Sequence, residues 1–204
     1  MDSQSNPWQV TSSRRVYDNP WIGVREDEVI RPDGEPGIYG VVEFRNWAIG
    51  VVPVTRDGDT FLVGQFRYPL GYYSWEIVEG GGPLDESPLA SAQRELREET
   101  GMTAKRWTYL GELALSNSVT NEVGCVFLAE DLEFGEAEPE GTEQLMVRRV
   151  KLDEAFRMAM TGEIADGLAI VGLARAYHYL QTNRGFEPVE RCFEGFGCPL
   201  TEAP

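Results

Sequence analysis

Three glutamates, Glu95, Glu98 and Glu99, are spaced so that a helix would bring their carboxylates together. At 3.6 residues per turn, Glu95 and Glu99 lie one turn apart on nearly the same line, with Glu98 beside them. Like charges at that spacing destabilise a helix by roughly 0.2–0.5 kcal/mol per pair unless a cation sits among them. Mg²⁺ prefers such oxygen ligands, together with waters and phosphate oxygens. The spacing therefore indicates either a divalent-cation site that handles phosphates or a solvated acidic face.

Local signals predict the helix that would carry these glutamates, over residues 88–100. Ser87 is a preferred N-cap residue, Pro88 suits the first helical position, and Gly101 marks the end. Apolar residues at spacings of three and four form the stripe that this helix would bury, namely Leu89, Ala92 and Leu96. The glutamates lie off this stripe, so the helix can pack and still present its carboxylates at one edge.

The glutamates belong to a longer pattern over residues 80–102. Its members stand at fixed intervals, as Gly80, Glu86, Arg94-Glu95-Leu96, Glu98-Glu99, Gly101 and the apolar Met102. This pattern resembles the Nudix box in every defining position. The resemblance implies a Nudix hydrolase with an α/β fold, an α/β/α sandwich with a mixed sheet. It also implies hydrolysis of a nucleoside diphosphate linked to another group, with Mg²⁺ or Mn²⁺ as cofactor.

The resemblance also implies which groups hold the metal. Glu95 and Glu99 are expected to bind it directly, whereas Glu98 binds it directly or acts through a water molecule. The family uses a backbone carbonyl from the residue just before the first glycine of the box. In this sequence that residue is Glu79, and the glycines that follow it permit close approach of the backbone.

Other residues are expected to position the carboxylates and to supply a base. Arg94 and Glu86 are expected to hold the helix carboxylates in place, because Arg94 can donate a charge-assisted hydrogen bond to Glu98 one turn later. Hydrolysis needs a base near the attacking water, and Glu98 is one candidate. The family places a second catalytic carboxylate in a loop that corresponds to the acidic residues 130–144 here. Glu140 and Glu143 are the candidates, with Glu143 favoured because it directly precedes the next strand, although this composition also suits a solvated loop.

A second resemblance narrows the substrate. Gln65-Phe66-Arg67 and Trp75-Glu76-Ile77 resemble the stretches that precede the box in ADP-ribose pyrophosphatase-like Nudix hydrolases. Arg67 is expected to bind the diphosphate of the substrate, and its alternative role is an ion pair with one of the many carboxylates. The subgroup implies conversion of ADP-ribose to AMP and ribose 5-phosphate.

One departure from the subgroup leaves other substrates open. Ser116 and Asn117 stand where the subgroup commonly has a proline. The alternatives are GDP-mannose or another nucleotide sugar, NADH, and a dinucleoside polyphosphate. Outside the enzyme class, the chain could be a nucleotide-binding sensor without turnover, or the acidic helix could be a solubility surface.

The composition limits the partners. The 204 residues are 42% apolar and carry a formal net charge of −16, with a pI near 4.4. That charge repels nucleic acid and anionic membranes, which favours a small nucleotide as ligand. The N-terminus has no basic and apolar leader, and no run reaches membrane-spanning length, so a soluble cytoplasmic protein is expected. Three cysteines are too few for a disulfide framework or a paired zinc site.

The chain divides into three segments. Residues 1–46 are expected to form an N-terminal β extension with strands over 8–17, 21–30 and 38–45. Members of the ADP-ribose pyrophosphatase-like subgroup use such an extension in a homodimer, and the alternative is a β-meander that covers its own subunit. Residues 47–183 are expected to form the Nudix domain, and residues 184–204 a C-terminal tail.

The Nudix domain is expected to begin with a hairpin of strands over 48–55 and 60–67, followed by a glycine loop at 80–82. After the box helix, strands are expected over 107–115, 123–129 and 145–150. The polar loop 116–122 and the acidic loop 130–144 would separate them. Two helices, over 152–160 and 165–182, would complete the domain.

Overall fold

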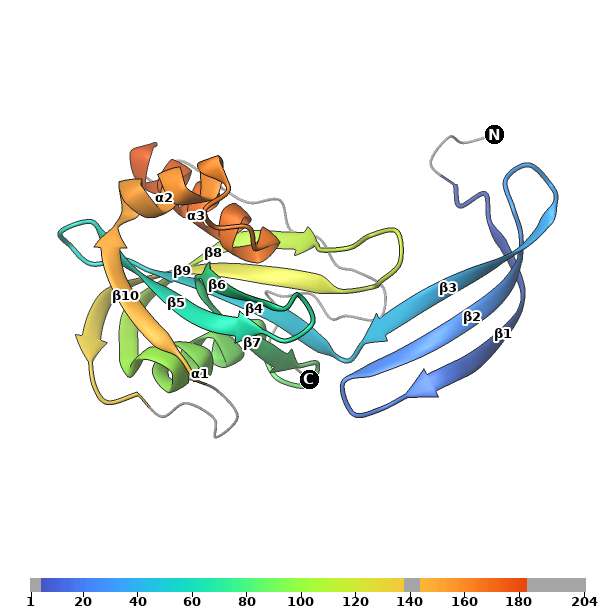
Figure 1. The fold of residues 1–204 in the computed structure, drawn as a ribbon, viewed down its shortest axis with the longest axis horizontal. Coiled ribbons are helices and arrows are strands. Elements are labelled where there is room, and N and C mark those ends of the chain that lie inside the picture. The colour runs from blue at the N-terminus through green and yellow to red at the C-terminus, as the bar shows by residue number, and fades with distance from the viewer. Residues whose placement is uncertain (1–4, 138–143, 183–204) are drawn as a thin grey trace. The chain divides into compact units, whose positions relative to one another are not determined.

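The computed structural model describes residues 5–137 and 144–182 (Figure 1). These residues form two compact units. The first contains the chain up to Asn46 together with Ser116–Glu122, and the second contains Trp47–Leu115 and the chain from Val123 onward. Each unit has its own sheet structure.

The first unit is a three-stranded antiparallel sheet in the order β1-β2-β3. Its strands are β1 (Gln9–Asp18), β2 (Ile22–Ile30) and β3 (Pro36–Phe44), which confirms the three strands expected from the alternating pattern. The segment Ser116–Glu122 belongs to this unit, because Val42 exchanges backbone hydrogen bonds with Val119 and Asn121.

The second unit contains two sheets. The first is mixed, in the order β7-β4-β9-β8, and contains β4 (Asn46–Pro53), β7 (Val78–Pro83), β8 (Met102–Ala114) and β9 (Val123–Phe134). Strand β4 runs parallel to β9, whereas β8 runs antiparallel to it. The second sheet is antiparallel, in the order β10-β5-β6, and contains β5 (Asp59–Arg67), β6 (Tyr72–Glu76) and β10 (Met146–Lys151).

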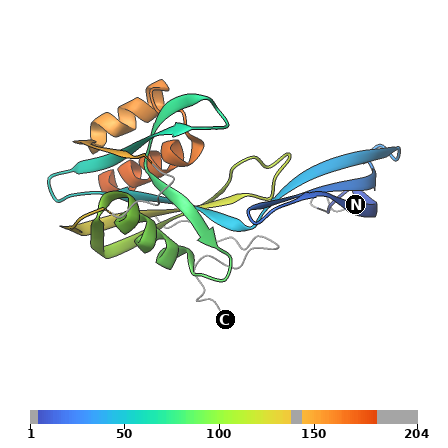
Figure 2. The same cartoon turned by 60° about the horizontal axis from the view of Figure 1, so that its bottom comes forward.

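Helices cover the mixed sheet from both sides, as Figures 1 and 2 show. They are α1 (Pro88–Thr100), α2 (Leu152–Thr161) and α3 (Gly167–Gln181). One apolar cluster joins α1 to the sheet through Ala92 and Leu96, and the other joins α2 and α3 to the opposite face. This arrangement confirms the predicted α/β sandwich with a mixed sheet.

The predicted hairpin between residues 48–55 and 60–67 is wrong. A tight turn does connect the two strands, but only a single bridge, Val54 to Thr60, joins them. Strand β4 instead pairs with β9 over Ala48–Pro53, and β5 pairs with β10 and β6. A strand that is buried on both faces needs partners on both edges, and these partners come from distant parts of the chain.

The predicted glycine loop is also wrong, because residues 78–83 form strand β7 beside β4. Packing against α1 favours glycine at position 82, because an added Cβ on Gly82 would lie 2.8 Å from Ser91 Oγ of α1. Strand β6 over residues 72–76 was not predicted. Two boundaries also differ from expectation, because β8 begins at residue 102 and β9 continues to residue 134 into the segment expected to be a loop.

Candidate active site

Helix α1 begins and ends where its sequence signals predict. The Oγ of Ser87 accepts a hydrogen bond from the backbone N–H of Ala90 at 3.2 Å. Gly101 has φ 70°, and its N–H donates to the carbonyl of Arg97 at 2.8 Å. A left-handed residue at this position ends a helix and favours glycine. Both ends are therefore set locally, which defines the rotation of the helix and the direction of its glutamates.

Burial separates the three box glutamates. Glu95 and Glu99 are buried, with 8% and 3% of their surface exposed, while Glu98 is half-buried. Two of the carboxylates therefore belong to the packed side of α1, against β7. Buried carboxylates at one edge of a helix are costly unless a cation or hydrogen-bond donors compensate them.

Strand β7 approaches the helix carboxylates closely. A Cβ atom added to Gly80 would lie 2.0 Å from Glu95 Cδ and 2.2 Å from each of its carboxylate oxygens. The backbone N–H of Glu79 donates to Glu99 Oε2 at 3.3 Å. A side chain at position 80 would displace the Glu95 carboxylate, so glycine lets the β7 backbone and this carboxylate lie together.

Arg94 lies among the carboxylates as predicted. Its Nη1 lies 2.8 Å from Glu98 Oε2 and 2.7 Å from Glu95 Oε1, and its Nη2 donates to the carbonyl of Gly81 at 2.8 Å. Burial opposes the charge of Arg94, but the two carboxylates outweigh it and raise the pKa of the guanidinium. Arg94 therefore links the acidic edge of α1 to strand β7.

Glu86 is close to this group but makes its main contact elsewhere. Its Oε2 accepts a hydrogen bond from Ser91 Oγ at 2.6 Å and lies 4.0 Å from Arg94 Nε. Glu86 thus ties the turn before α1 to the first turns of the helix. The hydrogen bond to Ser91 was not predicted. The signal that could have indicated it is the position of Glu86 just before the helix, five residues from Ser91.

Arg67, at the end of β5, makes a close ion pair with Glu76 of β6. The distances are 2.9 and 3.0 Å from Nε to the two carboxylate oxygens and 2.5 Å from Nη2 to Oε2. Glu76 is 1% exposed, whereas the Arg67 side chain is 34% exposed. The ion-pair alternative for Arg67 is therefore present, and its partner is a buried carboxylate. A role of Arg67 in substrate binding remains a prediction.

The side chain of Glu79 points away from α1 into a second acidic group. Burial raises the pKa of Glu79 well above its usual range, and the neighbouring charges of Asp166 and Glu76 raise it further. Arg67 Nη2 lies 3.5 Å from Glu79 Oε2, while the Oε1 atom is buried and finds no hydrogen-bond partner among the residues that the structure describes. Asp166 also caps α3, because its Oδ1 accepts from Ala169 N at 2.8 Å.

Sequence reasoning did not bring Glu76 and Asp166 into the site. Glu76 was visible only as part of the stretch before the box, and an aspartate before Gly167 is a helix N-cap signal. The other predicted base candidates, Glu140 and Glu143, lie outside the described residues.

The donor groups fit a hard divalent cation by their chemistry. Glu95, Glu98 and Glu99 offer carboxylate oxygens from one edge of α1, and the lack of a side chain at Gly80 lets the Glu95 carboxylate lie against β7. Within residues 5–137 and 144–182, no three His, Cys, Asp or Glu side chains converge at metal-binding spacing. Arg94 instead supplies the positive charge between Glu95 and Glu98. A cation would take over carboxylate oxygens that now face this guanidinium.

The fold and this helix define an α/β sandwich protein with a carboxylate cluster against a glycine-containing strand. Comparison with known families gives two matches. Residues 8–42 match a nucleoside diphosphate sugar hydrolase N-terminal domain, and residues 44–168 match a NUDIX domain. The second match covers more than half of the chain. The chain therefore belongs to the Nudix family and is a pyrophosphohydrolase, as its sequence predicted.

Relatives are similar along most of the chain. The ADP-ribose pyrophosphatase of Bacillus subtilis (strain 168) is 31% identical over 178 residues, which cover 86% of this chain and 94% of the relative. The ADP-ribose pyrophosphatase of Mycobacterium tuberculosis is 32% identical, over 86% of this chain and 85% of the relative. A GDP-mannose pyrophosphatase of Escherichia coli (strain K12 / DH10B) is 30% identical, over 78% and 83%.

A solved structure shows the same fold. The crystal structure of an ADP compounds hydrolase superposes with a TM-score of 0.78 and 20% sequence identity, and the match covers 87% of this chain and 96% of that chain. Nudix hydrolases as a class use a divalent metal. Among the described residues, no helix combines the length and apolar character needed to span a membrane.

Proposed function

We propose that this protein hydrolyses ADP-ribose to AMP and ribose 5-phosphate with Mg²⁺. The observation that carries the proposal is the cluster of Glu95, Glu98 and Glu99 on α1. Two of these carboxylates are buried, Glu95 against Gly80 and Glu99 against the backbone N–H of Glu79. The relatives named ADP-ribose pyrophosphatase support this substrate, because they match most of the chain at 31% and 32% identity. The match to a nucleoside diphosphate sugar hydrolase domain supports the wider substrate class.

Mg²⁺, or Mn²⁺ as the alternative, would be held by the carboxylates of Glu95 and Glu99 and by the carbonyl of Glu79. Glu98 would bind it directly or through a water molecule. When bound, the metal neutralises charge on the diphosphate and makes a water easier to deprotonate. Arg94 and Glu86 position the carboxylates from the side, Arg94 by its contacts of 2.7 and 2.8 Å and Glu86 through Ser91.

The base that takes the proton of the attacking water is Glu98, Glu140 or Glu143 in this proposal. Glu98 is half-buried and hydrogen-bonded to Arg94, so its carboxylate is held in one direction. Arg67 would bind the diphosphate of the substrate, because an arginine can pair with phosphate oxygens in a bidentate manner. Its partner Glu76 is almost fully buried and would keep the guanidinium at the end of β5.

GDP-mannose is the second candidate substrate, because a relative named GDP-mannose pyrophosphatase is 30% identical over 78% of this chain. It would use the same metal-binding helix and differ in the groups that recognise the base and the sugar. ADP-ribose would release AMP whereas GDP-mannose would release GMP, each with its own sugar phosphate, so product analysis distinguishes the two substrates.

The test is product analysis with ADP-ribose, GDP-mannose, NADH and a diadenosine polyphosphate, with and without Mg²⁺. Wild type, Glu98→Gln and Glu99→Gln are compared with Glu133→Gln, which removes one carboxylate from an exposed pair with Lys105. We expect Mg²⁺-dependent AMP release that is strongest with ADP-ribose, lost in the two box variants and kept in the control. Full kcat in both box variants would refute the site, and faster turnover of another compound would replace the substrate. Metal-dependent binding without turnover would favour a sensor.

The proposal includes a homodimer that forms through the N-terminal unit. All ten residues of β1 are exposed, and the exposed apolar side chains of this unit include Val10, Val16, Tyr17, Trp21 and Ile38. Apolar patches on small sheets commonly mark interfaces. Light scattering at micromolar concentration tests this point, and the mass of a monomer would contradict it.

The charge of −16 supports a small-molecule ligand rather than nucleic acid or membrane. Cytoplasmic localisation is part of the proposal as well, and fractionation of the native cells tests it. Binding of the purified protein to DNA or to anionic vesicles at physiological salt would contradict the expected absence of those partners.

A further inference from the structure

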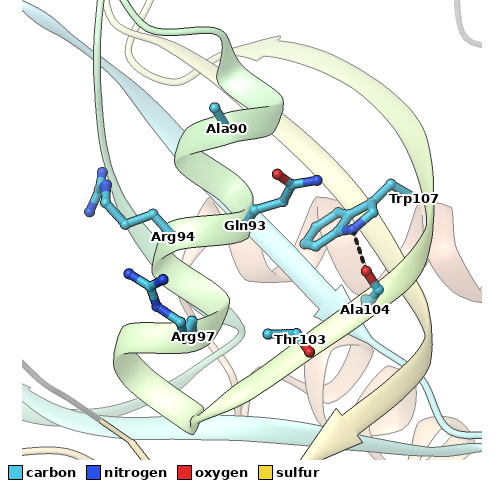
Figure 3. A pocket seen from close by; sticks show the side chains of 7 residues that line it. All are labelled: Ala90, Gln93, Arg94, Arg97, Thr103, Ala104 and Trp107. Atoms are coloured by element: carbon cyan, nitrogen blue, oxygen red, sulfur yellow. Dashed lines mark hydrogen bonds between the residues drawn. The ribbon is translucent and has the colours of Figure 1, made fainter.

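A cavity of about 510 Å³ lies between helix α1 and strand β8, lined by the seven residues labelled in Figure 3. Its volume lies within the range of small-molecule sites, roughly 300–1,000 Å³. The α1 residues that line it follow the spacing of one helix face, Ala90, Gln93, Arg94 and Arg97. Glu95 and Glu99 are not among the lining residues, so the cavity differs from the carboxylate edge.

The lining is positive in a strongly acidic chain. Arg94 and Arg97 line the cavity, and no aspartate or glutamate among the described residues does. Arg97 is exposed, and within the part of the chain that the structure describes its guanidinium makes no hydrogen bond or ion pair. An unpaired guanidinium offers donors in a planar fork that matches phosphate oxygens. The cavity is therefore suited to an anion.

The opposite side of the cavity is aromatic and polar. Trp107 of β8 is held in place, because its indole Nε1 donates to the carbonyl of Ala104 at 3.1 Å. Its ring also makes an edge contact with Phe127, with centroids 6.4 Å apart. Figure 3 shows the amide of Gln93 and the indole on the same side, while Arg94 and Arg97 extend toward the other edge of this helix face. A fixed indole is a surface on which a flat base can stack, and an amide can donate to and accept from its edge.

We propose that this cavity is a second nucleotide site, which binds a nucleoside monophosphate apart from the catalytic carboxylates. The base lies against Trp107 and Gln93, and the phosphate pairs with Arg97. An inorganic anion would use only the arginine side, and an apolar ligand only the indole side, whereas a nucleotide carries both kinds of group.

The cavity shares one residue with the catalytic edge. Arg94 lines the cavity and also contacts Glu95 and Glu98 at 2.7 and 2.8 Å. A phosphate that draws the Arg94 guanidinium toward the cavity weakens its hold on these carboxylates. Occupancy of the cavity is therefore coupled to the geometry of the catalytic edge, and the coupling acts in both directions.

Calorimetric titration of the full chain with AMP in EDTA tests the proposal. Metal and turnover are absent, so the result does not depend on which substrate the enzyme uses. The variants are Arg97→Ala, Arg67→Ala and the matched control Arg56→Ala, whose side chain is 88% exposed at another surface. We expect Arg97→Ala to weaken AMP binding about tenfold to hundredfold, as for loss of a charge-assisted contact. Arg67→Ala and the control should stay within twofold of wild type.

Three further measurements test the contribution of each part of the ligand. Adenosine should bind wild type and Arg97→Ala equally, and inorganic phosphate should bind wild type at least tenfold more weakly than AMP. Trp107→Phe should keep AMP binding and lose the quenching of tryptophan fluorescence that AMP causes. The proposal is overturned if AMP does not bind without metal, if Arg97→Ala binds it like wild type, if Arg67→Ala abolishes binding, or if phosphate binds as tightly as AMP.

Discussion

Replacing Gly80 by alanine tests whether the close approach of β7 to α1 sets the geometry of the metal site. The new Cβ would lie 2.0 Å from Glu95 Cδ and 2.2 Å from both of its oxygens. Carbon atoms in contact are normally about 3.5–4.0 Å apart, so the two groups overlap by about 1.5 Å. The carboxylate is the end of a flexible side chain. We therefore expect Glu95 to move and the backbone to stay.

The expected magnitudes differ for folding and for catalysis. A side chain forced off its preferred rotamer costs about 0.5–1.5 kcal/mol, which corresponds to a fall of about 1–6 °C in Tm for a chain of this size. A misplacement of about 1 Å in a catalytic site can lower the rate about 100-fold. Gly80→Ala should therefore lower kcat/KM about 100-fold and raise the Mg²⁺ concentration for half-maximal rate, with only a small loss of thermal stability.

Gly82→Ala is the matched control, because it adds the same methyl group two residues later on the same strand. Its Cβ would lie 2.8 Å from Ser91 Oγ, 3.0 Å from Ser91 Cβ and 3.1 Å from Ile49 Cγ1. These atoms belong to the packed interior, so overpacking should cost about 1–3 kcal/mol of stability. Initial rates against Mg²⁺ and thermal melts are measured for both variants. Wild-type kcat/KM and Mg²⁺ dependence in Gly80→Ala would refute the reasoning that Glu95 acts from this position.

Three other predictions follow from local contacts. Ser87→Ala removes the N-cap of α1 and should cost about 1 kcal/mol, seen as a fall of about 2–4 °C in Tm; an unchanged Tm would contradict the capping role. Hydrogen bonds from Lys151 and Arg149 lower the pKa of Asp59 below its usual 3.8. The ionised Asp59 carboxylate therefore stabilises the folded protein above pH 3.8, and this stabilisation is lost as the pH falls through the lower pKa of the folded state. Asp59→Asn should be less stable than wild type at pH 7 and equally stable in strong acid. Burial raises the pKa of the Cys125 thiol, so mass spectrometry should find Cys125 unmodified after alkylation of the native protein at pH 8, and rapid labelling would contradict this.

Helix α1 could be predicted almost to the residue, because its signals act over a few positions. The N-cap at Ser87 and the left-handed Gly101 are local backbone preferences, and the buried stripe of Ala92 and Leu96 follows from the helix repeat. The family followed from the same stretch, since the box places its glutamates within one helix. The link from Arg94 to Glu98 is a contact between neighbours on that helix, and it was predicted for the same reason.

Contacts between distant segments could not be predicted in this way. The turn between β4 and β5 indicated a hairpin, but the long-range pairing of β4 with β9 placed the two strands in different sheets. The glycines at 80–82 indicated a loop, whereas packing against α1 makes them part of strand β7. Glycine propensity is a weak local preference, and the burial of a whole strand outweighs it.

Arg67 and Glu79 show the same difference between local signals and long-range contacts at the site. The sequence identified both residues from their place before the box. It could not show that Glu76 binds Arg67, or that Asp166 from the start of α3 lies beside Glu79. Those contacts join residues up to 87 positions apart, from Glu79 to Asp166, and they exist only once the sheets and helices have packed. Local spacing therefore determined which residues carry the chemistry, while tertiary packing decided which charges face them, because electrostatic partners depend on distance in space.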